Sequence, residues 1–220
     1  MGHIDFIEKI HKSTKRDYLK RVTDYPKAEA SKVAKQFGYD FWDGDRKFGY
    51  GGHHYDGRWK SVAADLAHAY NLKSGSKVLD IGCGKGYLLY DLIQCVPGLV
   101  IEGLDISQYA LDHAQEEVKP FLRLGHAREL PYADHSFVLV LSINTLHNLP
   151  CYDLEKGLKE VVRVSKGKSY IVVDSFRNEE ERINLFYWHL TCACFYSIEE
   201  WHWWFNHCGY QGDYSFVYFE

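Results

Sequence analysis

One segment constrains the fold more than any other, the run KVLDIGCGKG at residues 77–86. Its first half is a short apolar stretch typical of a buried parallel strand. Glycines follow at every second position, and apolar residues from Tyr87 onward open a helix. A turn of this kind bends tightly and brings the backbone close to a ligand, which glycine permits. The segment predicts a strand–turn–helix unit of a doubly wound α/β fold, with free N–H groups at the helix start.

Strand and helix patterns alternate after this unit. Further strands are predicted near residues 99–104, 121–124, 137–141 and 170–173, and the closing SFVYFE also has the pattern of a strand. Alternation of this kind is typical of a parallel sheet covered by helices on both faces. We therefore expect a Rossmann-like, mostly parallel sheet of seven strands, or six, with the last strand antiparallel.

The N-terminal part has a different pattern. Helices are expected over the first 38 residues or so, with a start at Asp24-Tyr25-Pro26 and a stop at Gly38. Residues 39–57, YDFWDGDRKFGYGGHHYDG, show no period and are too aromatic for disorder, which indicates a functional loop. We expect residues 1–57 to form a helical cap with a substrate-covering loop, and residues 58–220 to form the main α/β domain.

The C-terminal part is expected to be helical before its last strand. A stripe of apolar residues runs from Ile183 to Cys194. A second helix is predicted to begin at a capping box of Ser197 and Glu200 and to end at Gly209.

Composition limits the partners. The formal net charge of the 220-residue chain is −4, so bulk electrostatics recruits neither nucleic acid nor an anionic membrane. No apolar run approaches the roughly 20 residues needed to span a bilayer, and the N-terminus lacks a signal peptide. The six cysteines are scattered as free thiols would be. We expect a soluble, cytoplasmic protein with a small-molecule partner, and a homodimer stays open.

Acidic residues near the glycine turn indicate the type of ligand. A second strand, about 20 residues on, ends in Asp105, whose carboxylate can accept both hydroxyls of a ribose. The third glycine comes one position too early for the dinucleotide fingerprint, and Tyr87 stands where that motif needs glycine. Asp80 would repel a pyrophosphate and attract an ammonium group. These features disfavour a nicotinamide or flavin cofactor.

Three blocks in this order resemble the class I S-adenosylmethionine (SAM)-dependent methyltransferases: VLDIGCGKG, GLDIS and GHARELPYADHSFVLVLSINTLHNL. The resemblance covers roughly residues 58–175 and implies SAM as cofactor, with S-adenosylhomocysteine as product. It implies that the turn glycines line the amino-acid part of SAM, namely Gly82, Gly84 and Gly86. It further places Asp80 at the amino group, Asp105 at the ribose and Ile106 against the adenine.

This chain departs from the family at one position of the adenine site. His126 stands where the family usually has an aspartate that binds the adenine amino group, so the Ala127 backbone is expected to hold the base. The fourth strand ends in Ser142, Ile143 and Asn144, which the resemblance places facing the transferring methyl. Ser142 is assigned to the cofactor and Asn144 to the acceptor.

A finer resemblance concerns the acceptor. The segments FWDGDRKFGYGGHHYDGRW and SINTLHNLPCYDLEKGLKEV resemble a bacterial subgroup associated with capsule and surface-polysaccharide biosynthesis. This implies a small, polar, anionic acceptor, such as a sugar- or phosphate-bearing precursor or a phosphoramidate, and O-methylation. The alternative is a non-catalytic, methyltransferase-like protein that binds SAM or a partner. Nucleobase N-methylation is disfavoured, because SINTLH lacks an Asn-Pro-Pro-aromatic motif.

Methyl transfer is an in-line displacement, so the protein mainly places the acceptor about 3 Å from the methyl. A hydroxyl acceptor must also lose a proton. The candidate bases are His147, after the fourth strand, and His53 and His54, in the 39–57 loop. Tyr50 and Arg58 are candidates for binding an anion, because a guanidinium grips phosphate or carboxylate as a fork.

We expect no bound metal. His189, Cys192 and Cys194 lie close together in the sequence, with His202, His207 and Cys208 further on, but their spacing matches no tetrahedral zinc pattern.

Overall fold

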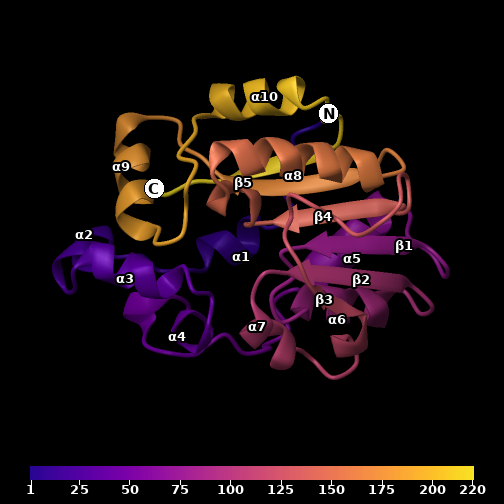
Figure 1. The fold of residues 1–220 in the computed structure, drawn as a ribbon, viewed down its shortest axis with the longest axis horizontal. Helices are drawn as coiled ribbons and strands as arrows, with labels where there is room; N and C mark the ends of the chain where they lie inside the picture. The colour runs from indigo at the N-terminus through magenta and orange to yellow at the C-terminus, as the bar shows by residue number, and fades with distance from the viewer.

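The computed structural model covers residues 1–220 and contains one six-stranded sheet, in the order β3-β2-β1-β4-β5-β6 (Figure 1). Its strands are β1 (Lys77–Ile81), β2 (Val100–Asp105), β3 (Leu122–Leu124), β4 (Leu139–Ile143), β5 (Ser169–Asp174) and β6 (Asp213–Val217). All neighbouring strands are parallel. The order reverses between β1 and β4, so a ligand crevice is expected beyond the carboxyl ends of these strands. The predicted doubly wound α/β fold is confirmed.

The expectation of an antiparallel last strand is wrong. β6 runs parallel to β5, from the pair Tyr170 and Asp213 to the pair Asp174 and Val217. Two helices, α9 (Glu179–Trp188) and α10 (Ile198–His207), connect these strands. A helical crossover returns the chain to the end of the sheet where β5 began, which makes the next strand parallel.

Helices cover both faces of the sheet because alternate strand residues point to opposite sides. Val78 of β1 belongs to one core cluster, with residues of α5 (Lys60–Ala69) and α6 (Tyr87–Cys95). Leu79, the next residue, belongs to the other, with residues of α8 (Cys151–Val164) and α10. Short elements complete this half of the chain: α7 (Gln108–Asp112), η2 (Lys119–Phe121) and η3 (Leu146–Asn148). The two apolar layers hold the strand ends in fixed positions.

The C-terminal helices follow the prediction in part. The capping box of Ser197 and Glu200 is present at the start of α10, as expected. The apolar stripe of residues 183–194 predicts one helix, but α9 ends at Trp188. Beyond it the backbone N–H groups of Ala193 and Cys194 donate to the carbonyl of His147 instead of to their own turn. The stripe is apolar there because this extended segment packs against the core, not because it is helical.

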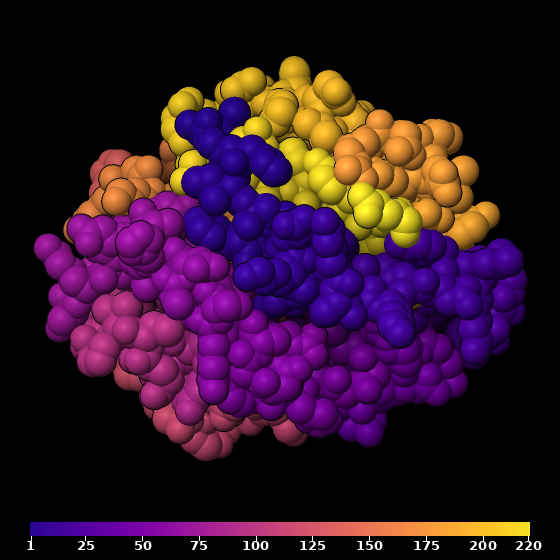
Figure 2. All heavy atoms as spheres, turned by 180° about the vertical axis from the view of Figure 1, so that it is seen from behind, coloured from indigo at the N-terminus to yellow at the C-terminus, as the bar shows by residue number.

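The N-terminal residues form α1 (Glu8–Lys12), α2 (Tyr18–Thr23), α3 (Lys27–Ala34), α4 (Tyr39–Trp42) and η1 (Arg46–Phe48). α3 begins after Pro26 as predicted, but it ends at Ala34, and Gly38 precedes α4 instead of stopping α3. The 39–57 loop therefore contains two short helical turns. Figure 1 shows α2 and α3 below α9, and Figure 2 shows the indigo N-terminal residues between the purple residues and the yellow C-terminus. No helix has the length and apolar character needed to cross a membrane.

Candidate active site

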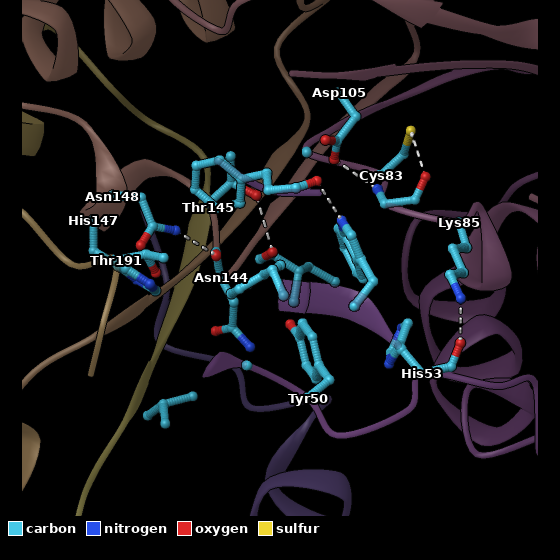
Figure 3. Close-up of a pocket in the computed structure, with 18 of the residues that line it drawn as sticks. Tyr50, His53, Cys83, Lys85, Asp105, Asn144, Thr145, His147, Asn148 and Thr191 are labelled. Carbon is cyan, nitrogen blue, oxygen red and sulfur yellow. Dashed lines mark hydrogen bonds between the residues drawn. The ribbon is translucent and has the colours of Figure 1, made fainter. Parts of the chain in front are cut away.

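A cavity of about 870 Å³ lies at the carboxyl ends of β1, β2, β4 and β5. It brings together thirteen of the predicted site residues: Tyr50, His53, His54, Arg58, Asp80, Gly82, Gly84, Asp105, Ile106, His126, Ala127, Asn144 and His147. Figure 3 shows Asp105, Lys85 and His53 toward one side of this space, Asn144 and His147 toward the other, and Tyr50 between them. Segments from both ends of the chain complete the lining. The cavity therefore has a part formed by the glycine turn and a part formed by the N- and C-terminal segments.

The glycine turn has no room for side chains. Gly82, Gly84 and Gly86 all have left-handed φ angles, of 80°, 55° and 71°. A Cβ at Gly82 would lie 1.9 Å from the Thr145 hydroxyl, and one at Gly84 would lie 2.8 Å from the Trp42 ring. Gly86 is the residue before α6 and does not line the cavity. The turn thus presents backbone to the cavity at two glycines, and the third allows α6 to begin.

Two buried carboxylates face this turn without a cation between them. Asp105 accepts hydrogen bonds from the N–H groups of Gly84, at 2.7 Å, and Ser107, at 2.8 Å. Burial raises the pKa of Asp105, and burial together with the charge of Asp105 raises the pKa of Asp80 to about 7. Such a pair fits a ligand that carries both ribose hydroxyls and an ammonium group. The two carboxylates of this crevice therefore fit SAM.

The surface beside Asp105 is suited to a flat ring. The Ile106 side chain is exposed and lines the cavity, and Ala127 lies on the cavity wall. His126 is fixed by its own turn, because its Nδ1 accepts from the Arg128 N–H at 3.2 Å. Ser142 is fully buried inside β4 and does not line the cavity. The roles of these residues remain predictions.

The 39–57 loop is fastened to the glycine turn by a buried ion pair. Lys85 donates to both carboxylate oxygens of Asp43 at 2.7 Å, and the two side chains are only 3% and 14% exposed. Asp43 also accepts from the His53 N–H and from the Tyr109 hydroxyl. The sequence did not predict this pair. The only signal was a lysine within GCGKG, and nothing local pointed to its partner 42 residues away.

Aromatic rings of the loop cover the turn. The Trp42 indole N–H donates to the Ser107 hydroxyl at 2.9 Å, and its ring lies against Gly84. Tyr50 stacks on Trp42 with ring centres 5.3 Å apart and is 43% exposed. The loop thus forms one wall of the cavity.

The predicted loop residues differ in what they contact. The His53 ring stacks on Tyr87, and burial with the nearby Lys85 charge lowers the pKa of His53 to about 4, so its imidazole is neutral. His54 is exposed at the cavity wall. Arg58 is forked on the carboxylate of Asp56, with N–O distances of 2.8 and 2.6 Å. Arg58 therefore already has an anionic partner.

His147 is buried and has a fixed tautomer. Its Nδ1 accepts from the Asp174 N–H at 3.2 Å, so the neutral ring carries its proton on Nε2, which lies 3.5 Å from an Asp174 carboxylate oxygen. Burial lowers the pKa of His147 to about 4. A ring of this tautomer faces Asp174 with its protonated Nε2, and its Nδ1 lone pair is occupied by the backbone N–H, so no lone pair is left to take a proton from a substrate.

The same carboxylate is paired with a second ring. His189 Nε2 contacts the Asp174 oxygen that faces His147. Although burial opposes it, the two histidines lower the pKa of Asp174 to about 2. The three side chains are close enough to suggest a metal site, with candidate ligand atoms within 4.8 Å of one another. The Nε2 proton of His147 argues against it, since that nitrogen cannot ligate while protonated.

The structure places Asn144 at the end of β4 with its side chain exposed to the cavity. Its φ angle is 55°, in the left-handed region, which asparagine tolerates better than most residues. Strained backbone of this kind gathers at functional sites.

Comparison with known proteins assigns the class. Residues 78–168 match the family described as "Methyltransferase domain". The structure resembles the YcgJ protein from Bacillus subtilis with a TM-score of 0.54 and 20% identity, over 66% of this chain and 67% of that one. Together with the parallel sheet, this defines the class I methyltransferase fold. The chain contains a class I methyltransferase domain, and the cofactor of this class is SAM, as the sequence predicted.

The curated relatives are named for different methyl acceptors. A demethylmenaquinone methyltransferase from Desulfitobacterium hafniense is 38% identical over 125 residues, 53% of this chain and 47% of that protein. A tRNA (carboxymethyluridine(34)-5-O)-methyltransferase from Arabidopsis thaliana is 30% identical over 145 residues, 66% of this chain and 34% of that protein. This chain spans about half the length of the demethylmenaquinone methyltransferases that it matches.

Proposed function

We propose that the protein transfers the methyl group of SAM to a small, polar, anionic acceptor. The observation that carries this proposal is that one cavity joins two chemically opposite parts. The crevice at β1 and β2 holds two buried carboxylates, Asp80 and Asp105, which suit the ammonium and ribose of SAM. The part formed by the N- and C-terminal segments is lined by the arginines Arg16, Arg21 and Arg46, which suit an anionic acceptor.

The residues of this chain would divide the chemistry between them. Bound SAM supplies an electrophilic methyl on a sulfonium. Asp105 and Asp80 would hold its ribose and ammonium, while Asn144, at the end of β4, would orient the acceptor. Trp42 and Tyr50 would exclude water from the glycine turn, because their stacked rings cover it.

For a hydroxyl acceptor, the contacts favour His189 as the base. Its Nε2 is paired with Asp174, so the neutral ring that donates to this carboxylate has its lone pair on Nδ1. Asp174 would orient the ring and stabilise the imidazolium that forms, as a carboxylate does in other catalytic triads. His147, His53 and His54 were the bases predicted from the sequence. The Nε2 of His147 lies 3.5 Å from the Asp174 carboxylate and its Nδ1 is occupied by a backbone N–H, which would make it a positioning residue.

The finer prediction, O-methylation of a capsule or surface-polysaccharide precursor or of a phosphoramidate, is also a proposal. It rests on the sequence resemblance, while the curated relatives are demethylmenaquinone and tRNA methyltransferases. The arginine-lined part supports a compact anion better than an apolar quinone ring. A net charge of −4 does not favour tRNA.

A transfer assay with methyl-tritiated SAM tests the proposal. Sugar phosphates, nucleotide sugars and phosphoramidates would be offered beside a demethylmenaquinone and bulk tRNA. We expect tritium in one of the small phosphate-bearing acceptors. Transfer only to the quinone or to tRNA would refute the proposed acceptor class. SAM binding by calorimetry without transfer to any acceptor would favour the non-catalytic alternative.

A further inference from the structure

Three arginines from separate segments converge on one tryptophan. The guanidinium carbons of Arg16, Arg21 and Arg46 lie 5.5, 5.2 and 5.1 Å from the centre of the Trp188 ring. Arg16 lies between α1 and α2, Arg21 in α2, Arg46 in η1, and Trp188 is the last residue of α9. Figure 1 shows α2 and α3 beside α9, so the chain folds these distant segments together. All four residues line the cavity of the candidate active site.

None of these three guanidinium groups is bonded to a carboxylate. Arg16 donates to the carbonyls of His11 and Thr14, and its Nε is buried without a partner. Arg21 donates to the carbonyls of Trp188, at 3.3 Å, and Arg46, at 2.6 Å, while Arg46 donates to a further carbonyl. Each of the other six arginines of the chain pairs with an acid: Arg58, Arg123, Arg128, Arg163, Arg177 and Arg182. The uncompensated arginines are therefore gathered at one place.

Three cations gathered without an acid repel one another, and a bound anion would relieve that repulsion. Burial and the charge of Arg46 lower the pKa of Arg21 to about 10, and burial also lowers the pKa of Arg16. Arg16 feels the charge of Asp174, but that carboxylate is already shared by His147 and His189. The face of Trp188 compensates only part of three positive charges.

We propose that Arg16, Arg21 and Arg46 form a subsite for a phosphate-type oxyanion of the acceptor, with Trp188 as its floor. A carboxylate has two oxygens, which one guanidinium fork can satisfy. Donors from three segments suit a tetrahedral group with three free oxygens, and three unpaired cations suit a dianion. The inference rests on the proposed function, because it assigns this anion to the methyl acceptor.

The place of the subsite fits that role. Trp188 is followed directly by His189, and the Trp188 carbonyl holds Arg21. A phosphate bound on the arginines would therefore anchor the acceptor beside the pair of His189 and Asp174. Its reacting hydroxyl would then lie toward the ends of β4 and β5, where the cofactor part of the cavity begins.

Binding measurements test the subsite without knowledge of the acceptor. Calorimetry would follow inorganic phosphate, a sugar monophosphate and acetate on the full chain, with Arg21→Gln and Arg46→Gln as variants. Arg182→Gln is the matched control, because Arg182 is exposed and paired with Glu179. We expect phosphate to bind the wild type and each variant of the cluster to bind it at least tenfold more weakly, as loss of a charge-assisted hydrogen bond implies. The control should retain wild-type affinity.

The outcomes separate the inference from the proposed function. Unchanged phosphate affinity in both cluster variants would overturn the subsite, as would acetate binding as tightly as phosphate. A sugar monophosphate that binds no better than inorganic phosphate would overturn its assignment to the acceptor. SAM affinity, measured on the same samples, should stay within twofold in Arg46→Gln. A wild type that binds phosphate through these arginines but fails to bind SAM would refute the proposed function alone.

Discussion

Replacing Asp80 by asparagine should make the protein more stable and its cofactor binding weaker. The Asp80 carboxyl is buried beside Asp105, and this burial raises its pKa from an ordinary 3.8 to about 7. A rise of this size corresponds to about 4 kcal/mol of lost stability where Asp80 is ionised in the unfolded chain. Asparagine has nearly the same shape and no charge, so it removes this loss of stability.

The sign of the pH dependence follows from the two pKa values. Below about pH 4, the folded and unfolded states both hold the Asp80 proton, and Asp80 does not lower the free energy of unfolding. Between about pH 4 and pH 7, the unfolded chain has lost the proton and the folded protein still holds it, so stability falls as pH rises. The stability advantage of Asp80→Asn should therefore grow across this window and level off above it.

Urea unfolding of the cofactor-free protein at several pH values measures this advantage. Taking the difference between Asp80→Asn and wild type cancels other groups, including His147, whose lowered pKa acts in the opposite direction. Calorimetry at pH 7.5 should show SAM affinity at least tenfold weaker in the variant, because the ammonium loses its carboxylate. A stability difference that does not change with pH, or unchanged SAM affinity, would refute the reasoning.

Four further predictions concern the neighbouring residues. Asp105→Ala should weaken SAM binding at least tenfold by calorimetry, since two ribose hydroxyls lose a charged acceptor; unchanged affinity would remove Asp105 from the cofactor site. Asp43→Asn should cost about 3–5 kcal/mol in urea unfolding, because Lys85 is left buried and unpaired, whereas the exposed control Asp45→Asn should cost less than about 1 kcal/mol. Once an acceptor is known, His189→Ala should lower kcat by about 10²- to 10⁴-fold with SAM affinity retained; a full rate would exclude it as base. His54→Ala and Arg58→Ala should impair turnover and leave SAM affinity nearly intact, and full activity in both would make the loop structural.

The cofactor side of the site could be predicted from the sequence because its chemistry is local. The glycines of the turn indicate left-handed backbone, and an acid at a strand end indicates a polar group at the edge of the sheet. Both signals lie within a few residues of a strong strand pattern. The structure places Asp80, Gly82, Gly84 and Asp105 together as that pattern implied.

Most of the proposed acceptor side could not be predicted, because it is assembled by tertiary contacts. Arg21 and Trp188 are 167 residues apart, and Lys85 and Asp43 are 42 apart, so no periodicity links them. The direction of β6 was missed for a related reason. It depends on how α9 and α10 route the chain, and a single strand pattern contains no information about that path.

The cofactor side and the proposed acceptor side of the cavity differ in how much the relatives tell about them. The match to the methyltransferase domain covers residues 78–168, which include the glycine turn and Asp105. Apart from Asn144, the residues that we propose for the acceptor lie outside that range on both sides: Arg16, Arg21, Arg46, Trp188 and His189. Relatives that share only the domain therefore share the residues that hold SAM. Their methyl acceptors need not be the acceptor of this chain. The arginines and Trp188 lie in segments that the family match does not cover, and their chemistry is the ground on which we propose a phosphate-bearing acceptor.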